Sequence, residues 1–467
     1  MKKVISILCV TVLILGMCAC GNIVTGVQDG ISKEPGNSTV TSEMQNGTKE
    51  APVAVDGLSM LAGDSYAHCN TEEGYYYITE KEICLKDGGY ATHLMYIDFA
   101  TQQEIYLCSD AGCSHDDESC GAVLKNDEFP WGSCKIFIWN GNLYILSKEY
   151  DSDGTVRIDM SMGAAGGYET EASQASLYRM NMDGTGRKRI YTFDDGLTLE
   201  DVIFAEGDCI YFVTKKLDTT VEGSTSVTSS TDRTLVCFTL GDGKLKKVLP
   251  LDFGDGVIWQ VVGCYDRSLV LEGISYADGS NADATMSQDE WENVYSKSQS
   301  VFATLDLDSS VLNQVYHIQN TGVHSSANRD GFLYVSIEST GTIEKLDLRT
   351  GKKNNLASLK QTNICGMVGN KLICRTWDMT SDYTLYFVDT ASGEVSHCGL
   401  VNKYNGWPLE VVGETENNAI VVYDFKADAH ADGSYEIYQY KIALLAKEDL
   451  YMGNGNYRPI QMIREGR

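Results

Sequence analysis

Short apolar runs of two kinds alternate along most of the chain, and this alternation is what most constrains the fold. The first kind follows a Gly, Asp or Asn turn signal, as in residues 330–335, and the second leads into a tight turn, as in residues 177–186. Each kind occurs seven times. The runs around Asp306, Asp347 and Asp389 recur at intervals of about 40 residues, the length of one four-stranded unit. Strand-like composition and the lack of any long helical periodicity indicate antiparallel hairpins.

The repeat therefore predicts an all-β fold, a β-propeller with seven four-stranded blades. A solenoid requires regular short coils, and a sandwich does not repeat its turn chemistry seven times. Residues 52–55, or the stretch as far as Leu61, are expected to pair with the last blade. Such pairing closes the ring and protects the edge strands that an open array exposes.

Strand parity predicts that one face of the propeller carries all the long insertions. In a four-stranded antiparallel blade, the first and third turns lie on one face, and the second turn and the blade-to-blade link lie on the other. The tight turns take the first and third positions. The second turns and one link contain the long insertions, which are residues 147–176, 214–234, 274–300, 425–436 and 109–133. Loops on a rigid scaffold are where binding residues concentrate, although neutral surface insertions fit the pattern equally well.

The N-terminus has the form of an export signal. Met1-Lys2-Lys3 is followed by an uncharged apolar run over residues 4–16, which is too short to span a bilayer. Residues 17–22, Met-Cys-Ala-Cys-Gly-Asn, resemble the lipobox of bacterial lipoproteins, in which a small residue precedes the cysteine that is acylated. Cys20 fits that position better than Cys18, because Ala19 is small. An ordinary cleaved signal is the alternative.

We accordingly divide the chain into a lipoprotein signal peptide over residues 1–20, a flexible tether over 21–55 and a propeller domain over 56–467. The tether is rich in Gly, Ser, Thr, Asn and Glu and has no aromatic residue, so it lacks the apolar surface that ordering requires. The expected location is extracytoplasmic, at the bacterial cell membrane, with the membrane as a partner through the lipid on Cys20.

The unit at residues 177–186 and the segment 107–122 together resemble a family of bacterial propeller lipoproteins of unknown function. Their propeller is similar to that of low-density-lipoprotein receptors. The resemblance covers about residues 60–450. It implies a propeller fold and a location outside the cytoplasm, and it implies no activity.

The charge balance excludes one class of partner. The chain has 65 Asp and Glu against 37 Lys and Arg, for a formal net charge of −28. Nucleic-acid binding requires Lys and Arg to neutralise phosphates, so we exclude a nucleic-acid partner.

One cluster of residues has the composition of a metal site. Cys108, Cys113, His115 and Cys120 place three thiols and one imidazole in a short segment, a donor set that suits tetrahedral Zn²⁺. Cys134 follows closely, so two disulfides account for the same pattern in an oxidising compartment. We expect disulfides or free thiols ahead of a metal, and a structural role in each case. No cofactor other than such a zinc ion is expected.

Aromatic residues in or near the long loops are the candidate ligand contacts. They can stack on sugars or anchor a protein, and the alternative for some of them is ordinary packing between blades. The set is Trp131, Tyr150, Trp291, Tyr295, Trp377 and Trp407. For catalysis, the chain contains no Gly-x-Ser-x-Gly elbow, no His-Glu-x-x-His and no phosphate-binding loop, so no catalytic residue is assigned.

The sequence therefore favours a lipid-anchored cell-envelope binding or scaffold protein that engages a protein or a glycan through the loop-bearing face. The alternative is a carbohydrate-active envelope enzyme, a hydrolase or lyase with its active site in the funnel. A carboxylate and histidine cluster in the funnel favours the enzyme, whereas an aromatic patch on the rim favours the binding protein.

Overall fold

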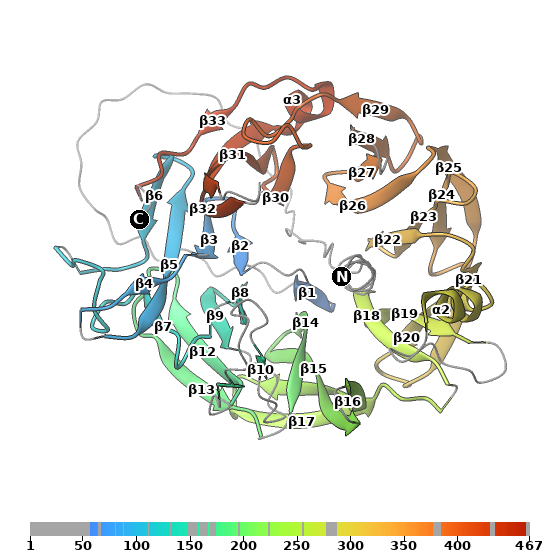
Figure 1. Cartoon of the computed structure of the whole chain (residues 1–467), viewed down its shortest axis with the longest axis horizontal. Coiled ribbons are helices and arrows are strands. Elements are labelled where there is room, and N and C mark those ends of the chain that lie inside the picture. Colours follow the sequence, from blue (N-terminus) through green and yellow to red (C-terminus); the bar gives the residue numbers. More distant parts are fainter. Residues whose placement is uncertain are drawn as a thin grey trace.

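Seven sheets are arranged in a ring around a central channel (Figure 1). The computed structural model describes residues 57–463, apart from 64–66, 80, 87, 111, 131, 148–156, 159–166, 169–173, 195–196, 223–224, 255, 277–286, 377–383 and 430–434. Each sheet contains one four-stranded antiparallel blade, and only about 3% of the chain is helical. The prediction of a seven-bladed β-propeller is confirmed.

The first three blades contain additional strands. Blade 1 consists of β2 (His68–Asn70), β3 (Gly74–Ile78), β5 (Tyr90–Asp98) and β6 (Gln103–Tyr106), with β4 (Ile83–Cys84) and β7 (Val123–Lys125) also paired to β5. Blade 2 consists of β8 (Cys134–Trp139), β9 (Asn142–Ser147), β12 (Ser176–Asn181) and β13 (Lys188–Thr192), and β10 (Arg157–Ile158) pairs with β11 (Gly167–Tyr168) beside it in sequence. Blade 3 consists of β14 (Thr198–Glu206), β15 (Cys209–Glu222), β16 (Thr225–Thr239) and β17 (Lys244–Pro250).

The remaining four blades are regular. Blade 4 consists of β18 (Ile258–Tyr265), β19 (Ser268–Ser275), β20 (Gln299–Asp306) and β21 (Leu312–Gln319). Blade 5 consists of β22 (His324–Arg329), β23 (Phe332–Ile337), β24 (Thr342–Asp347) and β25 (Lys353–Ser358). Blade 6 consists of β26 (Thr362–Val368), β27 (Lys371–Thr376), β28 (Thr384–Asp389) and β29 (Val395–Cys398). Blade 7 consists of β30 (Glu410–Glu414), β31 (Asn418–Ala429), β32 (Tyr435–Ala446) and β33 (Arg458–Pro459).

Two-residue turns set the register of the first hairpin in several blades. Asn140 and Gly141 connect β8 to β9 with φ values of 45° and 67°. Asp330 and Gly331 connect β22 to β23 with φ values of 54° and 79°. Two consecutive positive φ values define the turn whose twist matches that of the flanking strands, and Asn-Gly and Asp-Gly favour it. These turn signals in the sequence therefore mark real hairpins.

The core lies between the blades rather than inside any one of them. On β19, Val270 and Leu271 are both fully buried, yet they belong to different apolar clusters. Because successive side chains of a strand point to opposite faces, Val270 packs toward blade 5 and Leu271 packs toward blade 3. The inner and middle strands are apolar on both faces for this reason.

The N-terminal strand does not close the ring. β1 (Ser59–Ala62) pairs antiparallel with β14, so it extends blade 3 on the channel side (Figure 1). The expectation that the stretch to Leu61 pairs with the last blade is wrong, and residues 52–55 lie outside the described residues. Leu58 and Met60 explain the difference, because they are buried in the cluster that blades 3 and 4 share.

The C-terminal end of the chain contributes to closure instead. Gln461 forms a parallel bridge with Gln103 of β6, and the backbone of Glu104 donates to its carbonyl at 3.0 Å. Apolar residues of blades 1 and 7, including Tyr75 and Ile442, form one cluster across the seam, which is the contact between the first and last blades. The first and last blades are therefore joined by side-chain packing and by the segment after β33.

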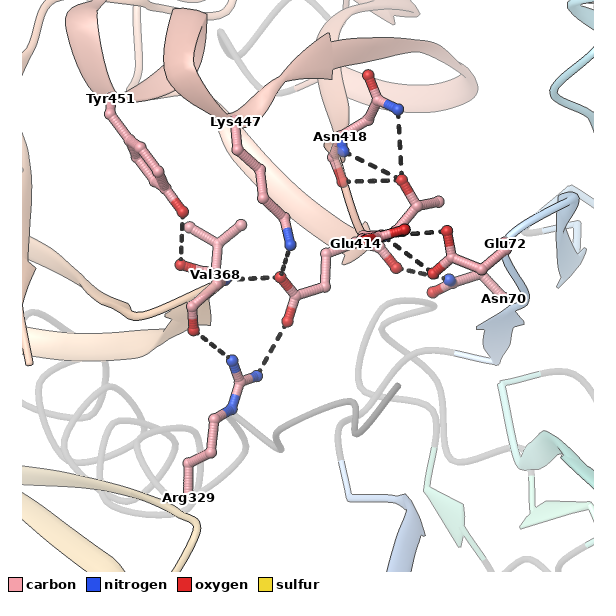
Figure 2. A network of polar contacts seen from close by, with 11 residues as sticks. Asn70, Glu72, Arg329, Val368, Glu414, Asn418, Lys447 and Tyr451 are labelled. Carbon is pink, nitrogen blue, oxygen red and sulfur yellow. Dashed lines mark hydrogen bonds and ion pairs between the residues drawn. The ribbon is translucent and has the colours of Figure 1, made fainter. Parts of the chain in front are cut away.

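A polar network centred on Glu414 ties four consecutive blades together near the channel (Figure 2). The buried carboxylate of Glu414 accepts from Arg329 of blade 5 at 3.1 Å, from the Gly369 amide of blade 6 at 2.6 Å and from Lys447 at 2.7 Å. Its backbone carbonyl accepts from the Asn70 side chain of blade 1 at 2.8 Å. A single buried acid thus has contacts on both sides of the seam.

The loop-bearing face is built partly from strands. Residues 214–234 and 425–436 were expected as loops, but β15 and β16 pair through residues 222 and 225, and β31 and β32 pair through residues 429 and 435. Residues 274–300 include the helix α2 (Gln288–Tyr295). The second helix, α3 (Lys447–Met452), lies in the third turn of blade 7. Among the described helices, none has the length and apolarity needed to cross a membrane.

Candidate metal centre and the loop-bearing face

The link between blades 1 and 2 brings the four predicted ligands together. The ligand atoms of Cys108, Cys113, His115 and Cys120 all lie within 4.8 Å of one another. Cys108 follows β6 directly, and the Cys113 amide donates to the Asp110 carbonyl at 3.3 Å, which turns the chain back. A tetrahedral zinc ion places its ligands at about 2.0–2.3 Å from the metal, a size that this cluster fits.

His115 is held by its surroundings rather than by the other ligands alone. Its ring stacks on Tyr106 with centroids 4.1 Å apart and planes inclined by 19°. Its carbonyl accepts a hydrogen bond from Nε2 of His93 at 2.7 Å, and its Nδ1 lies 3.2 Å from the Cys120 sulfur. The backbone is left-handed here, with φ at 57°. A residue that adopts this uncommon conformation is oriented by its contacts.

The protonation states of the free cluster differ from one ligand to the next. Burial lowers the pKa of the His115 imidazole, so the neutral form that binds metals dominates at neutral pH. Burial raises the pKa of Cys120 to about 12. Burial also opposes ionisation of Cys108, but hydrogen bonds from the Asp110 backbone and from the thiols of Cys120 and Cys113 outweigh it and lower its pKa. Cys108 is therefore ionised more readily than Cys120.

The cluster is anchored to both neighbouring blades. The Leu94 amide of β5 donates to the Ala122 carbonyl at 2.8 Å. The Arg187 guanidinium of blade 2 donates to the carbonyls of Gly121 and Val123 at 3.0 and 3.1 Å. Gly184 in the β12–β13 turn allows close packing on the link, because a Cβ there would lie 2.5 Å from the Leu107 carbonyl oxygen. The link is thus fixed on two sides around the four ligands.

Cys134 is not part of the cluster. It begins β8, is buried, and packs in an apolar cluster with its sulfur 3.7 Å from the Pro130 carbonyl oxygen. All cysteines in the described part of the chain are free thiols. Free thiols are one of the alternatives expected for this link, and Cys134 is not among the four grouped ligands. The disulfide and metal alternatives both stay predictions. Pairing to β9 holds Cys134 within the blade 2 sheet, whereas the four ligands lie in the link itself.

The predicted aromatic contacts are only partly described. Trp407 is 52% exposed, and Tyr295 at the end of α2 is half-buried. The side chain of Trp291, also in α2, lies outside the described residues, as do Trp131, Tyr150 and Trp377. The structure does not bring Tyr295 and Trp407 together, since they belong to the second turn of blade 4 and the link before blade 7.

Blade 7 has an exposed aromatic cluster that sequence reasoning missed. Tyr404 lies 4.4 Å from Phe425 and 5.4 Å from Tyr435, between ring centroids, and Phe425 stacks on Tyr435 at 5.5 Å. Tyr404 and Tyr435 are 42% and 39% exposed. We call Tyr404, Trp407, Phe425 and Tyr435 the aromatic patch, because Trp407 closes the turn that contains Tyr404 through a 2.7 Å hydrogen bond from the Asn402 amide.

The aromatic patch lies on the loop-bearing face. Tyr404 and Trp407 belong to the link between blades 6 and 7, and Phe425 and Tyr435 belong to the second hairpin of blade 7. Links and second turns share one face by strand parity. Asn405 donates from its side chain to the Tyr435 hydroxyl at 3.3 Å, which joins the two segments. The β31–β32 pairing sets Phe425 opposite Tyr440 and Tyr435 opposite Ala429, so no local sequence signal shows that the rings of Phe425 and Tyr435 meet.

One cluster contains the residue types of a catalytic triad without its geometry. His324 Nε2 lies 2.9 Å from one carboxylate oxygen of Glu272, and the Ser326 hydroxyl donates to the other at 3.1 Å. A serine nucleophile needs a histidine as its direct partner, and here the glutamate lies between them. The three side chains connect blades 4 and 5.

Comparisons with known proteins find solved structures with a similar fold, but they identify no family for this chain. No family model matches the sequence, and no curated protein is similar to it. A puromycin-hydrolyzing peptidase from Mycobacterium tuberculosis is 10% identical with a TM-score of 0.45, over 88% of this chain and 54% of the peptidase. An oligogalacturonate lyase in complex with manganese is 10% identical with a TM-score of 0.36, over 72% of this chain and 95% of the lyase. A chain in a nidogen/laminin complex is 12% identical with a TM-score of 0.30, over 73% of this chain and 92% of that one.

This chain spans about half the length of the peptidases it matches. At these identities and TM-scores, the similarities have no bearing on what the chain binds or whether it catalyses a reaction.

Proposed function

We propose that this chain is a lipid-anchored, extracytoplasmic protein that binds a protein or a glycan of the cell envelope through the loop-bearing face of its propeller. The anchor in this proposal is Cys20, and residues 21–55 are the tether. The export signal and the resemblance to propeller lipoproteins support the location. The aromatic patch is the single observation that supports the binding role.

The aromatic patch suits recognition because of its composition and its exposure. Tyr and Trp supply large contact areas at low cost in conformational entropy, and they are enriched in binding hot spots. Three of the four rings are each about half exposed, and Phe425 beneath them is buried. Grouped exposed aromatic rings on one face are typical of an interaction site rather than of scattered surface residues.

Zinc is the metal that the Cys108, Cys113, His115 and Cys120 site fits best. Three sulfurs and one nitrogen form a closed tetrahedral donor set of the structural type. In this proposal the ion has a structural role, since all four positions belong to the protein. It fixes the link, which lies on the same face as the aromatic patch.

The test compares variants on opposite faces of the full-length protein, purified in detergent. The triple variant Tyr404→Ser, Trp407→Ser, Tyr435→Ser removes the exposed rings. Val311→Ser, in the third turn of blade 4, removes a 57% exposed apolar side chain from the other face. Both are assayed on a glycan array and against detergent extracts of the cell envelope.

We expect a glycan or an envelope protein that is retained by the wild type and by Val311→Ser and is at least about tenfold weaker with the triple variant. Equal melting temperatures exclude misfolding as the cause. If no ligand is retained, or if the triple variant retains it as well as the wild type, the proposed function is wrong.

A further inference from the structure

A pocket lies at blade 1 on the loop-bearing face. It is bounded by the β31–β32 hairpin of blade 7 and by the end of the link that connects blade 1 to blade 2. Its volume is about 350 Å³. Blade 1 contributes His68 and Tyr77, blade 7 contributes Glu410 and Tyr440, and the link contributes Pro130. Cys134, the first residue of β8, also lines it, so the pocket lies where blades 1, 2 and 7 and the link meet. Ligand sites of small molecules have volumes of about 300–1,000 Å³ and prefer such junctions.

Four of the residues that line the pocket are tyrosines. Tyr75, Tyr77, Tyr438 and Tyr440 all line the pocket. The rings of Tyr75 and Tyr77 are 5.8 Å apart, and His68 stacks on Tyr75 at 5.3 Å. A tyrosine offers an apolar face for stacking and a hydroxyl for hydrogen bonding. A ligand that matches this lining has an apolar face and a polar edge.

Charge and polarity narrow the ligand class further. Glu410 and Gln439 line the same pocket, so its wall includes a carboxylate and an amide group. The whole chain has a net charge of −28. Nζ of Lys81 lies 5.5 Å from the centroid of the Tyr438 ring, but the charge of the chain as a whole disfavours acidic ligands and does not disfavour neutral hydroxyl-rich ones. Sugar rings combine hydroxyl edges with C–H faces that stack on aromatic side chains.

We propose that this pocket binds one or two pyranose rings of a neutral sugar. This inference rests on the proposed function and names a glycan as its ligand. The pocket lining does not include Tyr404, Trp407 or Tyr435, so the aromatic patch is a separate contact region. The sugar end of a glycan enters the pocket, and the patch contacts a different part of the ligand.

The test uses saturation-transfer NMR on the full-length protein in detergent. The probes are cellobiose and N-acetylglucosamine as neutral sugars, galacturonate as an acidic sugar and p-cresol as an apolar aromatic ring. Tyr438 is half-buried, so Tyr438→Ala removes a lining ring with little loss of core packing, and Tyr438→Phe is the matched control that keeps the ring.

We expect saturation transfer to at least one neutral sugar, in preference to galacturonate and p-cresol. Tyr438→Ala weakens binding about tenfold or more, and Tyr438→Phe weakens it by about threefold or less, because the stacking face remains. A wild-type protein that binds no neutral sugar overturns the proposal, as does equal or stronger binding of galacturonate or p-cresol. Sugar binding that Tyr438→Ala leaves unchanged also overturns it.

A second measurement needs no variant and covers the case in which Tyr438→Ala fails to fold. Tetranitromethane modifies accessible tyrosines, and cellobiose is expected to slow the nitration of Tyr438 and Tyr440 but not that of Tyr404. Uniform nitration with and without the sugar contradicts the pocket assignment. If the triple variant of the aromatic patch loses its envelope ligand while no neutral sugar binds, the pocket proposal fails and the proposed function stands.

Discussion

The carboxylate of Glu414 joins blade 7 to blades 5 and 6. Its carboxylate neutralises Arg329 and Lys447, which are largely buried with it. In Glu414→Gln the two cations lose their counter-charge, and removing one partner of a buried ion pair costs about 3–5 kcal/mol. We expect the free energy of unfolding to fall by about that amount in chemical denaturation.

The matched control is an exposed ion pair. Asp232→Asn removes the partner of Lys216, and both side chains are more than half exposed. Such pairs contribute about 0–1 kcal/mol. If Glu414→Gln is as mild as this control, the Glu414 carboxylate does not hold blade 7 to blades 5 and 6.

The cysteine cluster gives a second prediction at the residue scale. The protein as purified is expected to contain one zinc ion, and Cys113→Ser with Cys120→Ser abolishes it. At free zinc a thousandfold above its Kd, the bound ion stabilises the fold by about 4 kcal/mol. Denaturation with and without a chelator measures this difference, and the double variant shows none. Cys84→Ser, which alters an exposed thiol outside the cluster, leaves both values unchanged. If the wild-type protein contains no metal and a chelator does not change its free energy of unfolding, the zinc assignment is wrong.

Residue types alone located the candidate metal centre but not the aromatic patch. Cys108, Cys113, His115 and Cys120 are close in sequence, so their proximity in space needs little more than a turn. Tyr404 and Tyr435 are brought together by a link and a hairpin whose register no local signal encodes. With 27 tyrosines in the chain, composition could not single them out.

At the scale of elements, local turn chemistry predicted the hairpins and failed for long-range pairing. Asn140-Gly141 and Asp330-Gly331 mark their turns in the sequence itself. β1 pairs with β14 across more than a hundred residues, and its short apolar sequence fits any blade edge equally well. The extended hairpin of β15 and β16 was treated as a loop, although its Thr-rich and Val-containing sequence has the β propensity of strands.

The link after β6 is expected to respond to metal as one element. Removing zinc with a chelator should increase amide hydrogen exchange over residues 107–122, because the cross-link is lost, while β8 and β9 of blade 2 keep their protection. Mass-spectrometric hydrogen exchange resolves these segments. An increase spread evenly over all blades contradicts a local role for the metal, and no increase anywhere shows that hydrogen bonds such as those from Arg187 suffice.

At the scale of the whole molecule, the proposed location at the cell membrane requires an anchor. Cys20→Ala removes the residue that we propose is acylated, and stable anchoring depends on the acyl chains. We expect the variant in the soluble or secreted fraction after membrane sedimentation, with no palmitate label. Labelled palmitate that still enters the variant identifies Cys18 as the lipidated residue, and an unlabelled variant that still sediments with membranes contradicts lipid anchoring.

The central claim is that the loop-bearing face is the binding face. Hydroxyl-radical footprinting of the protein in native membranes, compared with the purified protein, tests it most directly. We predict that Tyr404, Trp407 and Tyr435 are protected in the membranes, while Met452, 65% exposed in a third turn on the opposite face, is labelled equally in both. Equal labelling of the aromatic patch in both samples, or protection of Met452 instead, contradicts the account.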